Sequence, residues 1–195
     1  MKKITLLSII IFILNTNLFA VSAEKMKRIF EGNKDAKIII ITYESLTCSH
    51  CADFHKNVYP NLKKDFIDTG LVKIEFRHFP LDLAALNASK IAQCNNDGNS
   101  KLMHILFSAQ SKWAKGNNVE EANGYLKKIL KDENINLDFK KCIGDKKIED
   151  YILNDRIEGV KKFKVNATPT IIINDKKFEK ALNYKNLKKY LEKLI

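Results

Sequence analysis

The sequence has little of several residues that would otherwise define a class of protein. Its 195 residues include one Trp, three Pro and seven Gly, and its arginines are Arg28, Arg77 and Arg156 among 34 basic side chains. No repeat, low-complexity tract or Pro/Gly-rich linker marks a second independent domain. The net charge of +11 comes from lysines spread through nearly every segment. Without a basic block or arginine cluster, the chain lacks a concentrated nucleic-acid-binding face, and we expect no nucleic-acid partner.

The chain also lacks an apolar run long enough to stay in a membrane. The run at residues 4–14 covers about 11 residues, whereas a transmembrane helix needs roughly 20. Lys2 and Lys3 precede this run and the small residues Val21-Ser22-Ala23 follow it, as in a secretory signal peptide. We therefore expect residues 1–23 to be an export signal, with cleavage after Ala20 or Ala23. The remaining chain of about 172 residues is then expected to be a soluble protein of the periplasm.

A strand, a helix and a second strand are expected in the first half of the chain. Residues 38–43 are almost continuously apolar, which is typical of a central strand buried on both faces. The next helix is interrupted by Pro60 and ended by Gly70. Residues 71–79 alternate between apolar and charged side chains and predict a second strand, joined to the first by a right-handed crossover. Four-residue spacing places a core-facing stripe on the helix: Phe54, Val58, Leu62 and Phe66.

The middle of the chain shows helical periodicity only. Helices are expected at residues 84–92, 102–113, 119–130 and 137–143, and they predict a small bundle inserted between two parts of a sheet domain. A longer helix is expected at residues 148–163. Its core candidates include Ile152, Ile157 and Val160.

The end of the chain returns to sheet. Residues 170–173 predict a buried strand, residues 174–176 a turn, and residues 177–179 a short pairing strand. The last helix is expected at residues 184–195, with Leu187, Leu191 and Leu194 facing the core.

Two cysteines separated by two residues stand between the first strand and its helix, in the sequence Cys48-Ser49-His50-Cys51. In a strand–helix context this pattern is typical of a thioredoxin-like redox motif. The helix N-terminus has unpaired backbone N–H groups and partial positive charge, so it stabilises a thiolate. The pKa of such a thiol falls below its free value of about 8.5, and the sulfur becomes reactive at neutral pH.

A zinc-binding module is the alternative for the same residues, with Cys48, His50, Cys51 and His55 as ligands. A structural zinc site normally uses two ligand pairs at compatible spacing. The other two cysteines form no such pair, and the remaining histidines, His78 and His104, are single residues typical of surface or core positions. We therefore favour redox chemistry and expect neither a metal nor another cofactor.

Several motifs together carry a family resemblance. The Cys48–Cys51 motif is followed by Phe54-His55 and Tyr59-Pro60, then by Phe79-Pro80-Leu81 before an alanine-rich helix, and finally by Thr168-Pro169-Thr170. The chain resembles the DsbA-like thiol:disulfide oxidoreductases of the thioredoxin superfamily over roughly residues 32–195. The resemblance implies an α/β thioredoxin-like fold with an inserted helical domain. The thioredoxin-like part would comprise residues 24–80 and 148–195, and the insertion residues 81–147.

The resemblance also implies roles for individual residues. Cys48 corresponds to the exposed nucleophile and Cys51 to its buried partner, and the two would form a redox-active disulfide. Ser49 and His50 would tune it, although the commonest oxidants of the family have proline in place of Ser49. Thr168 and Pro169 would bind substrate, with Pro169 as a cis-proline facing the cysteines. The implied function is the introduction of disulfide bonds into exported proteins.

Direction and partners follow from the same resemblance. The substrates would be reduced exported proteins, and a quinone-linked membrane oxidoreductase of the DsbB type would reoxidise the cysteines. A monomer is expected. A reductase or isomerase of the same fold is the alternative, although the roughly 14 residues between Ala23 and Ile38 leave no room for the dimerisation segment that isomerases carry. A binding protein with vestigial cysteines is a third, less favoured interpretation.

The sequence allows two interpretations of Glu44 and two of the cysteines Cys94 and Cys142. Family members often carry an acid six residues before the first cysteine, where this chain has Thr42; Glu44 is either its substitute or a surface residue at the strand end. Cys94 and Cys142 lie in the first and last helices of the insertion. In an exported protein with an even number of cysteines they are expected to form a structural disulfide, and two buried free thiols are the alternative.

Overall fold

The fold was taken from a computed structural model, which describes residues 25–195. The predicted export signal lies outside the described residues. Within residues 25–195 no helix has the length and apolar character needed to cross a membrane. The elements are β1 (Ile29–Gly32), β2 (Ile38–Glu44), α1 (Ser49–Asn57), α2 (Tyr59–Leu62), the π-helical turn η1 (Lys63–Ile67), β3 (Val72–His78), α3 (Leu83–Gln93), α4 (Lys101–Ser108), α5 (Gln110–Trp113), α6 (Val119–Asp132), α7 (Phe139–Gly144), α8 (Lys146–Phe163), β4 (Thr170–Ile173), β5 (Lys176–Lys177) and α9 (Tyr184–Leu191).

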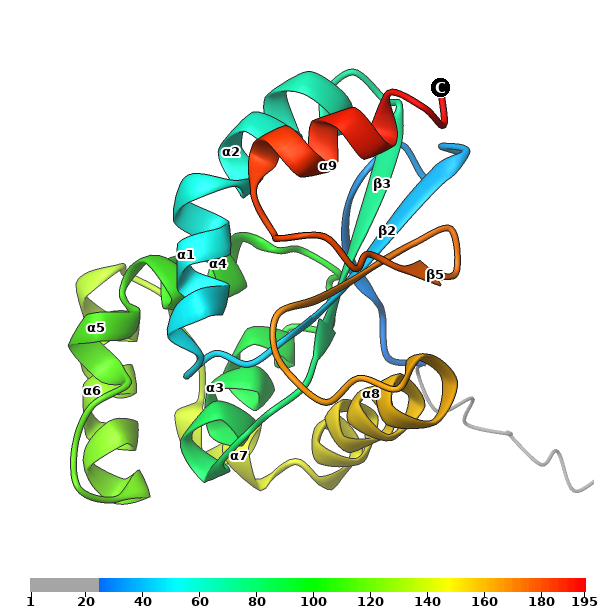
Figure 1. Cartoon of the computed structure of the whole chain (residues 1–195). Coiled ribbons are helices and arrows are strands. Elements are labelled where there is room, and N and C mark those ends of the chain that lie inside the picture. The colour runs from blue at the N-terminus through cyan, green and yellow to red at the C-terminus, as the bar shows by residue number, and fades with distance from the viewer. Residues whose placement is uncertain (1–24) are drawn as a thin grey trace, which may run out of the picture.

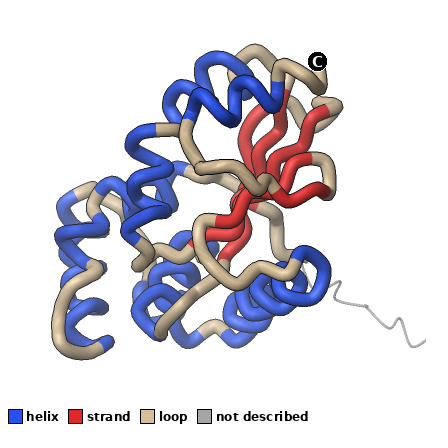
Figure 2. Tube along the Cα trace, in the orientation of Figure 1, coloured by secondary structure: helices blue, strands red, loops and turns tan. Residues whose placement is uncertain are grey.

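A five-stranded sheet in the order β1-β3-β2-β4-β5 forms the centre of the molecule (Figure 2). β2 is parallel to β3 and antiparallel to β4, while β1 and β5 are antiparallel additions at the two edges. The apolar strand after residue 37 is therefore central, as predicted. Its end carries the chain directly into the segment with the two cysteines.

Helices cover both faces of this sheet (Figure 1). Alternate residues of β2 divide between two cores because successive side chains of a strand point to opposite faces. Ile38 and Ile40 belong to the larger core, which α1, α2, α4 and α9 complete. Ile41 and Tyr43 belong to a smaller core that includes Phe163 at the end of α8. Helices α3 to α7 follow β3 and pack beside α1 and α8.

The helix that follows the cysteine motif is broken where the sequence predicted an interruption. α1 ends at Asn57, and α2 carries Pro60 in its first turn, where a missing backbone N–H costs no helical hydrogen bond. The predicted stripe from Phe54 to Phe66 is confirmed, since its four members are at most 7% exposed.

Several predicted boundaries were wrong at chain positions where a turn intervenes. The single helix expected at residues 102–113 is two helices, because Ala109 leaves helical geometry. The last strand begins at Lys176 instead of residue 177, because Asn174 and Asp175 form a two-residue turn with positive φ at both positions. α9 ends at Leu191, and Leu194 is 42% exposed instead of facing the core.

The buried face of α8 was also misassigned. Ile157 and Val160, predicted as core residues, are 47% and 46% exposed. The buried positions include Asp155 and Gly159, which a search for apolar residues passes over. Gly159 is needed because a Cβ there would lie 2.7 Å from the ring of Tyr43.

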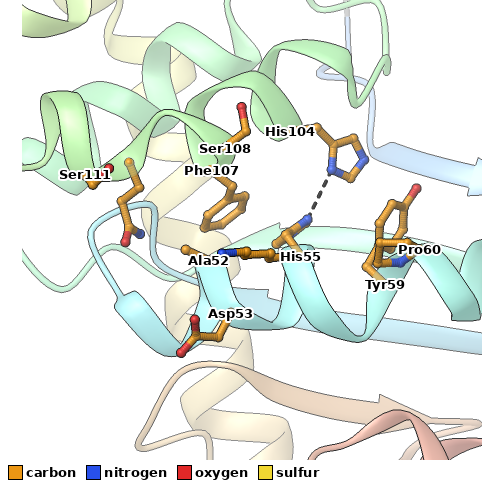
Figure 3. Close-up of a pocket in the computed structure, with 11 residues that line it drawn as sticks. Ala52, Asp53, His55, Tyr59, Pro60, His104, Phe107, Ser108 and Ser111 are labelled. Atoms are coloured by element: carbon orange, nitrogen blue, oxygen red, sulfur yellow. Dashed lines mark hydrogen bonds between the residues drawn. The ribbon is translucent and has the colours of Figure 1, made fainter.

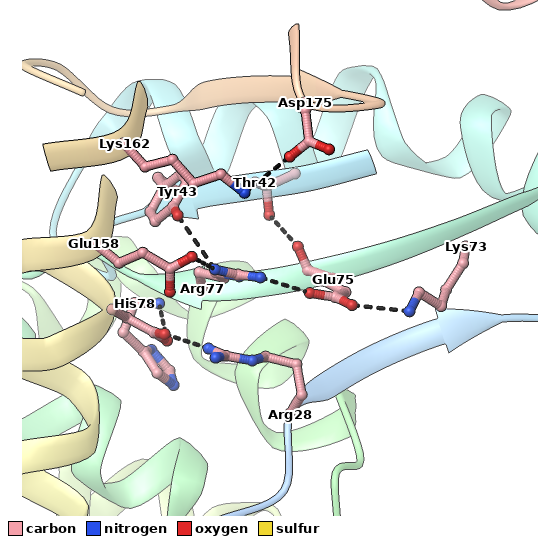
Figure 4. A network of polar contacts seen from close by, with 11 residues as sticks. Arg28, Thr42, Tyr43, Lys73, Glu75, Arg77, His78, Glu158, Lys162 and Asp175 are labelled. Carbon is pink, nitrogen blue, oxygen red and sulfur yellow. Dashed lines mark hydrogen bonds and ion pairs between the residues drawn. The ribbon is translucent and has the colours of Figure 1, made fainter. Parts of the chain in front are cut away.

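Ion pairs fix α8 to the face of β3 (Figure 4). Arg77 of β3 contacts Glu158 of α8 at 2.8 Å and Glu75 at 3.1 Å, and Lys73 contacts Glu75 at 2.8 Å. The Arg77 guanidinium also donates to the hydroxyl of Tyr43 at 3.4 Å. The Arg77–Glu158 ion pair thus joins β3 to α8, and the Arg77–Tyr43 contact joins β3 to β2.

Candidate active site

The two cysteines lie where β2 has ended and α1 begins. Cys48 is the N-cap residue of α1, with extended backbone geometry, and its carbonyl accepts the backbone N–H groups of Cys51 and Ala52 at 3.1 and 3.2 Å. Cys48 is partly exposed, whereas Cys51 lies one turn into the helix and is fully buried. Both are free thiols in this structure.

The surroundings of Cys48 favour its thiolate. The Cys51 thiol donates a hydrogen bond to the Cys48 sulfur, and this contact outweighs the opposing effect of partial burial. The side chain of Thr168 and hydrogen bonds from the backbone N–H groups of Cys51 and His50 act in the same direction. Together they lower the pKa of Cys48 to about 5. At neutral pH its sulfur is therefore a nucleophile.

The surroundings of Cys51, in contrast, disfavour its thiolate. Burial raises the pKa of its thiol strongly, and the neighbouring Cys48 and the negative charge of Glu44 raise it further. Glu44 itself is 3% exposed. The surface interpretation of this residue was wrong, because β2 points it inward beneath α1. Thr42, the other residue considered for this position, is buried and donates to the carbonyl of Glu75 at 3.4 Å.

The loop before β4 faces Cys48 from across the site. The Thr168–Pro169 peptide bond is cis. Cys48 Sγ lies 3.2 Å from the carbonyl oxygen of Thr168, to which the thiol donates when it is protonated. The Thr168 hydroxyl is buried without a hydrogen-bond partner among the described residues. A groove of about 530 Å³ runs past this loop and is lined by residues that include His50, Phe54 and Pro169. The structure thus brings the two cysteines, His50, Thr168 and Pro169 together.

One residue beside the cysteines had no signal in the sequence. Gln110, at the start of α5, donates from its side-chain amide to the carbonyls of Leu46 and Cys48, both at 2.9 Å. It ties the helical region to the active-site loop. No short motif surrounds it, so the contact could not be found without the fold. Ser49 is exposed and makes none of these contacts.

His55, one of the two histidines considered as zinc ligands, has other partners. His55 Nε2 lies 2.9 Å from Glu44 Oε2, and its Nδ1 lies 3.1 Å from Nδ1 of His104. Among residues 25–195 no group of three or more His, Cys, Asp or Glu side chains is placed to hold a metal ion.

The second pair of cysteines is bridged. Cys94 follows α3 and Cys142 lies in α7, and a disulfide joins them with their Cα atoms 5.5 Å apart. Because α3 and α7 lie at opposite ends of the helical region in sequence, the bond closes a loop of 48 residues. Cys142 is buried in the larger core and Cys94 packs against that core.

Comparison with known proteins supports the same family. A family model described as thioredoxin matches residues 24–193. A crystal structure of alpha-DsbA1 from Wolbachia pipientis superposes with a TM-score of 0.77 at 32% identity, covering 86% of this chain and 90% of that one. The chain is a DsbA-like member of the thioredoxin superfamily. The predicted α/β thioredoxin-like fold with an inserted helical region is confirmed.

Curated relatives of the DsbA-like chain carry names from disulfide chemistry. A Rickettsia bellii protein named as a protein-disulfide oxidoreductase is 35% identical over 148 residues, which cover 73% of this chain. The DsbA-like chain spans only 55% of the length of that relative. Disulfide bond formation protein D of Bacillus subtilis is 28% identical over 175 residues, covering 83% of this chain and 74% of that protein.

Proposed function

We propose that the chain is an exported thiol:disulfide oxidoreductase that introduces disulfide bonds into other exported proteins through a Cys48–Cys51 disulfide. The observation that carries the proposal is the division of properties between the two thiols. The partly exposed Cys48 has a pKa lowered to about 5, while burial raises the pKa of Cys51. One sulfur is therefore suited to accept attack and leave as thiolate, and the other to hold a proton.

The first step begins from the oxidised chain. A substrate thiolate attacks the Cys48 sulfur, and a new disulfide forms between substrate and Cys48 as the Cys48–Cys51 bond breaks. The electron pair of that bond leaves on Cys51, which takes up a proton because its thiolate is disfavoured by burial. Glu44, a buried acid whose charge acts on Cys51, is proposed to supply this proton.

The second step releases the product. A second substrate thiolate attacks the substrate sulfur of the mixed disulfide, and the electron pair of the broken bond leaves on Cys48. The lowered pKa of Cys48 makes it a good leaving group, which favours donation of the disulfide to substrate. The substrate has then lost two electrons and the chain has gained them.

Thr168 and Pro169 are proposed to hold the substrate during both steps. They lie against Cys48, and the groove beside them is open to an extended chain segment. His50 and Ser49 are proposed to tune the potential of the couple from their exposed positions at the start of α1. No cofactor takes part in this scheme.

The cellular setting is proposed from the export signal expected at residues 1–23 and from the likeness to DsbA proteins. The chain would act as a monomer in the periplasm. A reoxidising partner must remove the two electrons after each cycle, and a DsbB-like, quinone-linked membrane oxidoreductase is proposed for that role.

Transfer of the disulfide can be measured directly. The oxidised chain is mixed with a reduced, unfolded model protein, and new disulfides are counted by alkylation and mass spectrometry. We expect one disulfide per chain, none from Cys48→Ala or Cys51→Ala, and undiminished transfer from a variant lacking both Cys94 and Cys142. Transfer that survives Cys48→Ala would overturn the proposal in favour of a binding protein.

A further inference from the structure

A line of four polar side chains begins at Glu44, whose charge acts on the buried Cys51, and passes a cavity between α1 and α4. Glu44 contacts His55 at 2.9 Å, His55 contacts His104 at 3.1 Å, and His104 contacts Glu31 at 2.7 Å. The line joins β2, α1, α4 and β1, so four elements meet in it. Figure 3 shows the central contact, with His55 and His104 at the wall of the cavity.

Together the three contacts need one more hydrogen than two neutral imidazoles supply. Each of the three contacts requires one hydrogen between its two heavy atoms. Two carboxylates and two neutral imidazoles contain two such hydrogens, because a neutral imidazole has one N–H. The third hydrogen makes either one histidine an imidazolium or one glutamate an acid. The line therefore contains one transferable proton, which moves along it when each hydrogen shifts across its own contact.

The two ends of the line have different environments. At the inner end, Glu44 Oε1 is buried without a hydrogen-bond partner among the described residues, and its charge acts on Cys51. At the outer end, burial alone would raise the pKa of Glu31, but hydrogen bonds from His104, Ser100 and Tyr59 outweigh it and lower the pKa to about 2. Glu31 thus remains a carboxylate, and the proton is confined to the groups on its inner side.

Solvent reaches the line at its second histidine. The side chain of His55 is 6% exposed and stacks on Phe107, with ring centroids 4.1 Å apart. The side chain of His104 is 26% exposed and lines a cavity of about 660 Å³ together with Ser108 and other residues of α1 and α4. Both nitrogens of His104 have protein partners, so water in that cavity exchanges a proton with His104 when the contact from Nε2 to Glu31 opens. Water has little access to Glu44, whose side chain is 3% exposed.

We propose that His55 and His104 relay the proton of Cys51 between Glu44 and the solvent of this cavity. The inference rests on the proposed function, since only thiol exchange makes Cys51 gain and lose a proton. When Cys51 attacks a disulfide at Cys48, Glu44 Oε1 takes up its proton, the hydrogens of the line shift outward across their contacts, and His104 releases one proton from Nε2 to water. In the opposite direction the proton follows the reverse path. The histidines act on Cys51 through Glu44 and are positioning residues.

Other charged groups near the relay set its electrostatics. The titratable groups in contact with the two imidazoles are Glu44 of β2, Tyr59 of α2 and Glu31 of β1. Asp53 and Lys56 of α1 line the same cavity. Beyond them, Lys63 lies 3.4 Å from Glu31. Tyr59 donates to Glu31 at 2.5 Å, and burial, followed by the neighbouring carboxylate, raises its pKa, so it remains protonated and offers no competing exit.

The test separates a step that needs the relay from one that does not. Reduced protein is mixed with glutathione disulfide, and samples are quenched in acid and weighed by mass spectrometry. In the first step the Cys48 thiolate forms a mixed disulfide at a rate proportional to glutathione disulfide concentration. In the second step Cys51 loses its proton and releases glutathione at a concentration-independent rate.

His104→Gln interrupts the relay without touching either cysteine, and Ser108→Ala, on the same helix and cavity wall, is its matched control. We expect His104→Gln to slow the second step by about 10- to 100-fold. A positioned proton-transfer group raises a rate by about 10²- to 10⁴-fold, and water takes over part of this role when the group is removed. The first step should keep its rate. In His104→Ala, imidazole buffer at fixed pH should restore the second step in proportion to its concentration.

Each outcome decides a different question. An unchanged second step in His104→Gln overturns the relay, and so does a loss that imidazole does not relieve, because a structural role then accounts for it. An equal loss in both steps also overturns it, since the substitution has then disturbed Cys48. If the unsubstituted chain forms no mixed disulfide at Cys48, the proposed function itself fails.

Discussion

Acidification should destabilise the reduced chain through Cys48. The folded chain lowers the pKa of this thiol from 9.0 to about 5, and the unfolded chain has no such environment. Between these values the unfolded state binds more protons, so the stability of the reduced form rises with pH. The contribution of Cys48 ionisation to the free energy of unfolding is complete above about pH 9 and is lost as pH falls through about 5.

The size of the effect at neutral pH follows from the two pKa values. At about pH 7 the folded thiol is almost fully ionised and the unfolded thiol only about 1% ionised, a difference of about 100-fold or about 2.7 kcal/mol. Cys48 is partly exposed, and solvent screening reduces such a value, so we expect about 1 to 2 kcal/mol.

The assay compares the reduced chain with Cys48→Ser, which shares every other titrating group. Denaturant unfolding at several pH values gives the difference in free energy of unfolding, and ultraviolet absorbance of the thiolate gives the midpoint of titration. Since the hydrogen bond from Cys51 is the largest cause of the lowered pKa, Cys51→Ala should move the midpoint upward. Cys51→Ser keeps a donor and should move it less.

A titration midpoint of Cys48 near the ordinary thiol value would contradict a stabilised thiolate. So would a difference between the chain and Cys48→Ser that stays constant from about pH 5 to about pH 8. Either result would remove the electrostatic argument for an oxidant.

Three further predictions concern stability, and denaturant unfolding measures each. Removing the Cys94–Cys142 disulfide should cost up to about 4 kcal/mol for a loop of this length while leaving Cys48 reactive; an unchanged unfolding midpoint would contradict this. Gly159→Ala should cost about 1 to 3 kcal/mol because its Cβ would overlap the Tyr43 ring, and a neutral result would refute the close packing. Burial lowers the pKa of His78 to about 4, so stability should fall as pH drops below about 6.5, and His78→Gln should weaken that dependence.

The central strand and the helix of the cysteine motif could be predicted because their signals are local. Residues 38–43 are apolar on both faces, and Phe54 to Phe66 repeat with helical spacing. Such patterns depend on the burial of one segment and need no knowledge of its partners. The alternation of apolar and charged side chains predicted β3 for the same reason.

The buried face of α8 could not be predicted by the same reasoning. Its orientation follows from Asp155, which pairs with Arg28, and from Gly159, which admits the Tyr43 ring. Neither residue is apolar and large, so the pattern favoured Ile157 and Val160 instead. Tertiary contacts overrode the hydrophobic signal.

The residues of the site also fall into those with a local sequence signal and those without one. The cysteine motif and the Thr168-Pro169 pair were visible because each is a short, contiguous sequence. The line from Glu44 to Glu31 was not visible, because His55 and His104 lie 49 positions apart and meet only when α4 packs on α1. A single histidine in a sequence does not indicate its partner.

The most direct test of the proposed function is the equilibrium of the Cys48–Cys51 pair with glutathione. The chain is equilibrated in buffers of graded thiol-to-disulfide ratio, trapped in acid, and each thiol is mapped by mass spectrometry. We predict that the pair stays mainly reduced in buffers where glutathione itself is half oxidised, because the Cys48 thiolate stabilises the reduced form. A pair as reducing as that of thioredoxin, oxidised throughout the same series, would contradict the oxidase assignment and identify a reductase.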